Sequence, residues 1–120
     1  MRNLPENLKQ NKEGIFELSE NAQNDIKEIW FYISENSVNS ADKLISELFR
    51  KFQLLAKNFE LGKSRNEYFI NLRSFPLKKY IIFYVPTENG IEIFRVIHSS
   101  RNIEGLFDEF FGDLESAETE

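Results

Sequence analysis

The sequence predicts an α+β fold: an antiparallel helical hairpin packed on a mostly antiparallel four-stranded sheet, in the order β-α-α-β-β-β, with a short C-terminal helix. Two observations support this prediction. Apolar residues recur with a helical period in the first half of the chain, and they follow a strand-like pattern in the second half. The length of 120 residues fits one domain.

Two helical patterns occupy the first half. A short strand is expected over residues 14–18, and Ser19 stands where a helix N-cap belongs. Ser40 is expected to cap a second helix, whose apolar face spans residues 41–59 and which Gly62 ends. Only a few polar residues separate the two patterns, which predicts a helical hairpin. The apolar face of the first helix is formed by Ala22, Ile26, Ile29, Trp30 and Ile33.

The second half contains three strand patterns. Residues 68–75 are expected to form a strand that Pro76 ends, because proline cannot donate to a β-ladder. Residues 79–85 are β-branched and aromatic with little polar alternation, which indicates a central strand covered on both faces. The Asn-Gly pair at 89–90 suits positive φ in a hairpin connection, and residues 91–97 form the returning strand.

The helical hairpin can cover only one face of this sheet, so the other face needs a second cover. Residues 103–110 offer one, because Ile103, Leu106, Phe107 and Phe110 have the spacing of one helical face. From residue 112 the chain is acidic and poor in apolar residues, and we expect disorder there. The chain therefore divides into a polar extension (1–13), a domain (14–111) and an acidic tail (112–120).

Composition excludes several classes of protein. The chain has no cysteine, which rules out disulfides, thiolate zinc sites and cysteine nucleophiles and fits a reducing cytoplasm. No apolar run approaches the ~20 residues that span a bilayer, and the N-terminus does not resemble a signal peptide. With one histidine and no glycine-rich phosphate loop, we expect no metal and no cofactor.

Charge is segregated along the chain. The net charge is −5, but residues 63–101 carry seven basic and three acidic side chains, and residues 102–120 carry seven acidic and no basic ones. This pattern predicts a basic patch that meets an acidic partner, and an acidic tail able to compete for it. The alternative is an unevenly charged, solvated surface.

The basic block supplies the candidate site. Arginine binds phosphate or carboxylate bidentately, and His98 is the one side chain with an ordinary pKa near neutrality. Together with Arg73 and Arg101, His98 could support RNA cleavage; the alternative is that His98 ends a strand and bonds backbone. The candidate binding residues are Arg65, Arg73, Lys78, Lys79, Arg95, His98 and Arg101.

Three motifs in order resemble the RelE/ParE toxin family over residues 14–107, and the pattern is closest to its ParE branch. The first is Leu-Ser-Glu-Asn-Ala at 18–22, with Asp25-Ile26 and the run 29–33. The second is Asn-Leu-Arg-Ser-Phe-Pro at 71–76, followed by residues 80–84. The third covers 90–98 and ends in His98, with Arg101-Asn102 after it.

The resemblance implies a cytoplasmic toxin of a type II toxin–antitoxin pair that binds and poisons DNA gyrase. A ParD-like antitoxin would neutralise it by filling an apolar groove flanked by Arg73, Lys79 and Arg95. The favoured mechanism is non-catalytic, through the basic face and the C-terminal segment. We also expect the acidic tail to fold over the basic block.

Two alternatives stay open. A RelE-like endoribonuclease would cleave mRNA on the ribosome with His98, Arg73 and Arg101. The net charge of −5 counts against it, since RNA binding depends on phosphate neutralisation. The third possibility is a degenerate interaction module that is no longer toxic.

Overall fold

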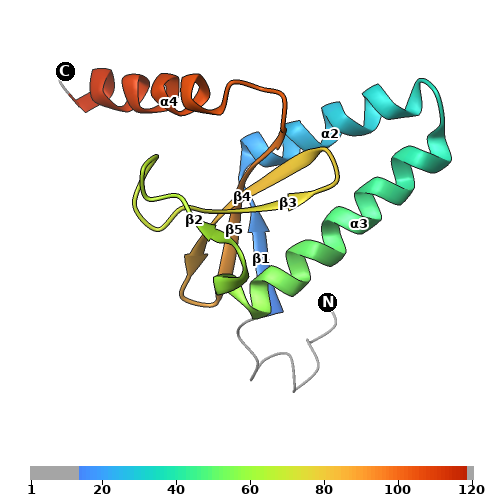
Figure 1. Cartoon of the computed structure of the whole chain (residues 1–120), viewed down its shortest axis with the longest axis horizontal. Coiled ribbons are helices and arrows are strands. Elements are labelled where there is room, and N and C mark those ends of the chain that lie inside the picture. The colour runs from blue at the N-terminus through green and yellow to red at the C-terminus, as the bar shows by residue number, and fades with distance from the viewer. Residues whose placement is uncertain (1–13, 119–120) are drawn as a thin grey trace, which may run out of the picture.

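The computed structural model describes residues 14–118 and confirms the α+β fold (Figure 1). Its strands follow the order β1-β5-β4-β3-β2, with β1 parallel to β5 and every other pair antiparallel. The sheet thus has five strands where the sequence predicted four. The elements are β1 (Ile15–Leu18), α2 (Glu20–Ser34), α3 (Val38–Lys57), the 3₁₀ turn η2 (Phe59–Leu61), β2 (Lys63–Ser64), β3 (Arg73–Leu77), β4 (Tyr80–Thr87), β5 (Gly90–His98) and α4 (Ile103–Glu118).

The helical hairpin forms as predicted, with one change of cap. Ser19 caps α2, its hydroxyl accepting from the Ala22 N–H at 3.0 Å. The cap of α3 is Ser37, whose hydroxyl accepts from the Ser40 N–H, so the prediction of Ser40 was three residues late. The prediction was late because Val38, in the first turn of α3, is exposed and does not belong to the buried face. The periodic apolar pattern of the sequence therefore begins at Ala41.

The strand predicted at residues 68–75 differs in its bounds from β3. Residues 68–72 lie outside β3, which runs through Pro76 instead of ending before it. The Leu72 carbonyl accepts from the Arg65 N–H, so the backbone groups of Leu72 point toward the side of β3 where β2 lies. Every second residue of a strand points its backbone groups to the same side, so the backbone nitrogen of Pro76 also faces that outer side. Since β2 reaches only as far as Ser74, no strand lies opposite Pro76 and its missing N–H costs no ladder bond.

The sheet separates two apolar layers, as predicted. Ile82 and Tyr84 of β4 pack beneath the α2–α3 hairpin, while Phe83 between them faces α4, and all three are buried. Phe107 of α4 is 1% exposed and stacks on Tyr68 with ring centroids 4.6 Å apart. Strand β4 is therefore central and covered on both faces.

Helix α4 is longer than the sequence predicted. It continues past Gly112 to Glu118, beyond the helical pattern of residues 103–110. Leucine, alanine and glutamate, which favour helix, outweigh the cost of one glycine there. The expected extension at residues 1–13 lies outside the described residues, as do 119–120.

Two glycines are required by close approach rather than by their backbone angles. The predicted positive φ at residues 89–90 is absent; among described residues it occurs at Asn71 and Lys78. A Cβ on Gly90 would stand 1.7 Å from the Ile15 carbonyl oxygen, where β1 meets β5. One on Gly62 would stand 2.2 Å from the Tyr84 hydroxyl.

The Tyr84 hydroxyl ties the segment after α3 to the sheet. It accepts from the Gly62 N–H at 2.9 Å and donates to the Phe59 carbonyl at 2.6 Å. Burial raises the pKa of the Tyr84 phenol. Because the folded state holds this proton beyond the pH at which an unfolded tyrosine releases it, its stabilising effect is present below pH ~10 and falls as pH rises further.

We therefore predict that Tyr84→Phe lowers the free energy of unfolding by about 1–3 kcal/mol at pH 7, because the buried Gly62 N–H and the partly buried Phe59 carbonyl lose their partner. Above pH ~10 the difference between wild type and variant should narrow. Urea unfolding at pH 7 and in alkali measures both effects. The exposed Tyr32→Phe is the control, and equal stability of the two variants at pH 7 would contradict the role given to Tyr84.

Candidate functional site: a cationic cleft

A cleft of about 890 Å³ opens between the α2–α3 hairpin and the end of the sheet where β3 turns into β4. Four of the seven residues predicted from sequence line it: Lys78, Lys79, His98 and Arg101. They come from the β3–β4 turn and from the end of β5 and the segment after it. The facing wall comes from α2 and α3, which contribute Glu28, Tyr32, Ser40, Lys43 and Glu47, and the floor includes Ile29, Leu44 and Val96.

The turn between β3 and β4 places two lysines at the cleft. It has only two residues, since Leu77 pairs with Tyr80, and Lys78 takes φ 54°, a conformation that favours glycine. The Lys79 carbonyl accepts from the Ser99 N–H at 2.8 Å, which fastens the turn to the chain after β5. The lysines at 78 and 79 are thus held by backbone bonds rather than by a flexible loop.

Lys78 bridges the two walls of the cleft. Its Nζ lies 2.9 Å from Glu47 Oε1 on α3. The adjacent Lys78 ammonium lowers the pKa of the Glu47 carboxyl. Glu47 therefore stays ionised near neutrality, and the pair leaves no net charge at that point of the wall.

His98 has a defined hydrogen-bonding state. Its Nδ1 lies 3.1 Å from the Ser100 backbone N–H, which can only donate, and 2.8 Å from the Ser100 hydroxyl. Nδ1 is therefore an acceptor, and the neutral ring carries its proton on Nε2. The ring also meets Tyr80 edge-on, with centroids 5.3 Å apart.

Three cations of the cleft stay without a charged partner. Among the side chains of residues 14–110, the salt bridges involve Arg65, Lys78 and Arg95, and not Lys43, Lys79 or Arg101. The carboxylates of Asp25 and Glu47 are already paired, which leaves Glu28 to oppose these cations. The cleft is thus cationic although the chain is not.

Arg95, which the sequence indicated as a binding candidate, does not line the cleft and is engaged inside the fold. Its guanidinium grips the Asp25 carboxylate through two hydrogen bonds, at 2.7 and 2.8 Å, and is largely buried. These hydrogen bonds raise the pKa of Arg95, so it is always charged. Asp25 also accepts from the Val96 N–H at 3.0 Å. One carboxylate therefore satisfies three donors of β5.

Sequence reasoning missed Asp25, although a signal was present. Asp25 sits between Ala22 and Ile29 on the apolar face of α2, where a carboxylate needs a partner. Its partner could not be found by spacing, because Asp25 on a helix and Arg95 on a strand lie 70 positions apart in the chain. A register shift in the β4–β5 ladder lies beside Arg95. The shift lies where Tyr84 pairs with Ile93 and Phe83 pairs with Arg95.

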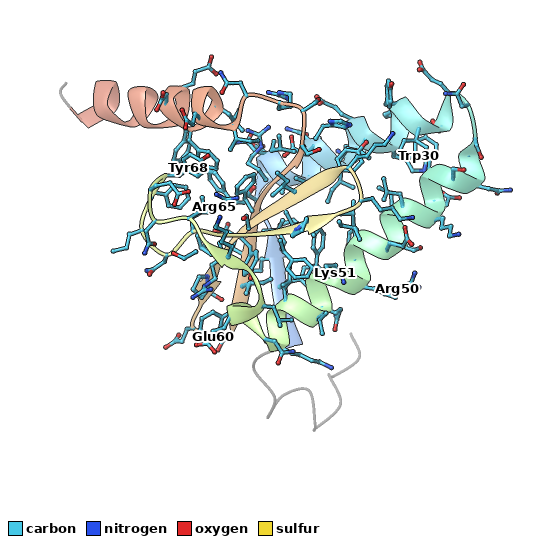
Figure 2. The ribbon with its side chains drawn as sticks, viewed as in Figure 1. Trp30, Arg50, Lys51, Glu60, Arg65 and Tyr68 are labelled. Atoms are coloured by element: carbon cyan, nitrogen blue, oxygen red, sulfur yellow. The ribbon has the colours of Figure 1, made fainter. Side chains whose placement is uncertain are left out.

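Arg65 and Arg73 also lie apart from the cleft. Arg65 donates to the Ser74 hydroxyl at 2.9 Å and pairs with Glu67, whose pKa is lowered by its own backbone N–H and by Arg65. Arg73 donates to the Gly62 carbonyl at 2.7 Å and lies over the Phe59 ring. Figure 2 shows Arg65 with Tyr68 on the side beneath α4, away from the α2–α3 hairpin.

The described helices include none that is long and apolar enough to cross a membrane. Within the same residues, no group of histidine and carboxylate side chains gathers as metal ligands would. The fold and the site together define a small α+β domain whose main feature is a cationic cleft.

The family model of the ParE toxin of the type II toxin–antitoxin system parDE matches residues 16–103, well over half of the chain. The chain therefore belongs to the ParE toxin family, as the three motifs indicated. It is similar in fold to a solved chain of the chromosomal ParDE system from P. aeruginosa, with a TM-score of 0.60 at 16% identity. That match covers 72% of this chain and 97% of the other. No curated protein sequence matches this chain.

The ion pair between α2 and β5 gives a direct prediction. Asp25→Ala leaves a largely buried guanidinium and the Val96 N–H without their partner, so the free energy of unfolding should fall by about 3 kcal/mol. Chemical denaturation measures the loss. Glu28→Gln, one turn further along α2 and exposed, should change stability by less than about 0.5 kcal/mol. If the two variants are equally stable, the Asp25–Arg95 pair does not hold the hairpin to the sheet.

Proposed function

We propose that this chain inhibits growth by binding DNA gyrase and that a ParD-like antitoxin neutralises it. Membership of the ParE toxin family supports the toxin class. The observation that carries the binding mechanism is the cleft, where Lys43, Lys79 and Arg101 stay unpaired in a chain of net charge −5. Unpaired cations concentrated in one concave surface favour a partner that brings carboxylates.

The cleft also revises the expected antitoxin groove. Arg73 and Arg95 are engaged inside the fold, so the groove is flanked by Lys79 and Arg101 instead. In this proposal, acidic side chains of the antitoxin pair with these two residues, and apolar ones rest between α2 and α3. Tyr32, which is 72% exposed at the cleft, supplies apolar surface to such a partner.

The geometry favours binding over RNA cleavage. A general base must offer an unprotonated atom to the proton that it removes. Nδ1 of His98 already accepts from Ser100, and the neutral ring holds its proton on Nε2. Arg73 donates to the Gly62 carbonyl and does not line the cleft, so the trio of His98, Arg73 and Arg101 is not assembled in one place.

The binding proposal predicts that Lys79→Ala with Arg101→Ala lowers toxicity at least about tenfold while the protein stays folded, since both side chains are exposed. Growth on induction and gyrase supercoiling with purified protein give the two readouts. The matched control is Lys57→Ala with Lys63→Ala, which removes the same charge outside the cleft. Full inhibition of gyrase by the folded cleft variant would overturn the mechanism.

The RNase alternative is tested separately. We predict that His98→Ala leaves growth inhibition within about twofold of wild type and that neither protein cleaves translated mRNA, because His98 is not set as a base. Primer extension on mRNA from induced cells measures cleavage. Wild-type cleavage that is lost in the variant would favour the endoribonuclease. Normal growth with the wild-type chain would instead indicate the non-toxic module.

A further inference from the structure

The cleft carries more positive charge than one carboxylate can neutralise. Lys43, Lys79 and Arg101 have no charged partner among the described side chains, and Glu28 is the one unpaired carboxylate of the lining. Three cations against one carboxylate leave a local charge of +2. A carboxylate brings a single negative charge, whereas one phosphate group brings about two. The charge of the cleft therefore matches a phosphate better than a carboxylate.

Two uncharged donors add to these cations. His98 accepts at Nδ1 from Ser100, and no described group accepts from its Nε2–H. Ser40, in the first turn of α3, donates its backbone N–H to the Ser37 hydroxyl, while its own hydroxyl has no partner in the described part of the chain. Phosphate oxygens accept from N–H and O–H donors as well as from cations. The cleft thus has free donors of both kinds.

The same cleft contains aromatic surface. Tyr32 on α2 is largely exposed there, and Tyr80 at the start of β4 lies in the lining as well. Burial raises the pKa of Tyr80 and the Tyr32 phenol adds to the rise, so the two phenols lie within electrostatic reach of each other. The floor beside them includes Leu44 and Val96. A planar base can stack on an exposed ring above such an apolar floor.

The chain's own acidic tail does not close the cleft. The sequence suggested that this tail folds over the basic block, but in Figure 1 helix α4 runs outward over the sheet, away from the α2–α3 hairpin, as far as Glu118. Packing of Phe107 against Phe83, with ring centroids 5.2 Å apart, fixes the start of that path. The backbone through residue 118 therefore leaves the cleft open to a ligand from solution.

We propose that the cationic cleft binds a nucleoside polyphosphate. Its phosphates contact Lys43, Lys79 and Arg101, and its base lies against Tyr32. The volume of about 890 Å³ falls within the range of small-molecule sites. Because Lys79 and Arg101 also hold the acidic partner of the proposed function, the nucleotide competes with that partner. The competition rests on the proposed function, whereas nucleotide binding needs neither gyrase nor antitoxin.

Local charge decides this interaction rather than net charge. The net charge of −5 repels a polyanion at long range, but salt at about 0.1 M screens charges separated by more than about 10 Å. At contact the ligand meets the unpaired cations of the cleft. The affinity should therefore fall as ionic strength rises.

Isothermal titration calorimetry of the purified full chain at about 50 mM salt, without divalent cations, tests the proposal. We expect ATP to bind, tripolyphosphate to bind at least about fivefold more weakly because it lacks a base, and adenosine not to bind measurably. No binding of ATP, or equal binding of ATP and tripolyphosphate, would overturn the proposal. Tighter binding of a single-stranded oligothymidylate than of ATP would assign the cleft to nucleic acid and overturn it as well.

Two matched pairs of variants locate the ligand, and all four side chains are exposed. Tyr32→Ala should weaken ATP at least about fivefold and leave tripolyphosphate unchanged, because it removes stacking surface alone. Its control is Phe31→Ala, the exposed neighbour outside the cleft, which should change neither.

The second pair tests the charge. Lys43→Ala should weaken both ATP and tripolyphosphate at least about tenfold, since a hydrogen-bonded cation is lost from the phosphate site. Lys57→Ala, on the same helix but outside the cleft, should bind both like wild type. Wild-type affinity in Lys43→Ala, or equal losses in Tyr32→Ala and Phe31→Ala, would place the nucleotide elsewhere. Gyrase inhibition is measured separately, so its failure and the failure of nucleotide binding are distinguishable.

Discussion

The ion pair between Asp25 and Arg95 is the constraint on which the rest of the structure depends. It joins the middle of α2 to β5 at the one register shift of the described β4–β5 ladder and satisfies the Val96 N–H as well. Because the pair is largely buried, the angle between hairpin and sheet cannot change without exposing or orphaning a charge. The width of the cleft follows from that angle, since Asp25 itself lies on the cleft wall.

The cleft is positively charged because nearby carboxylates are already paired with other cations. Arg95 neutralises Asp25 and Lys78 neutralises Glu47, so carboxylates that would otherwise cancel the rim lysine and arginine are occupied. Lys79 and Arg101 then face solvent. Of the carboxylates that line the cleft, Glu28 alone is left to oppose these two residues and Lys43. A chain with net charge −5 can in this way present a positive surface to an acidic partner.

The two faces of the sheet are covered by different elements. The hairpin side carries the larger core and the cleft, while the opposite side is closed by α4 and by the aromatic loop before β3. Arg65 bonds Ser74 on the side of this second region, whereas Arg73 pairs in register with Tyr84 of the hairpin-side core and fastens the segment after α3. Arg65, Arg73 and Arg95 of the basic block therefore bond within the fold, while Lys79 and Arg101 stay without a charged partner at the cleft.

The sequence by itself determined the fold class, the Ser19 cap, the central position of β4 and the cover supplied by Phe107, because each depends on local periodicity or capping chemistry. It also included Lys78, Lys79, His98 and Arg101 among seven candidate residues, and the structure brings these four to one cleft because the β3–β4 turn lies beside the end of β5.

Only the tertiary structure decided which charges are free. Arg95 pairs with Asp25, which lies 70 positions away in the chain, and Lys78 pairs with Glu47 across the cleft. The spacing of residues in the sequence predicts neither pair. The direction of α4 was equally hidden, because ring packing against Phe83 and Phe94 sets it. Charge counts along a chain identify candidates, but pairing in space determines which of them remain available to a partner.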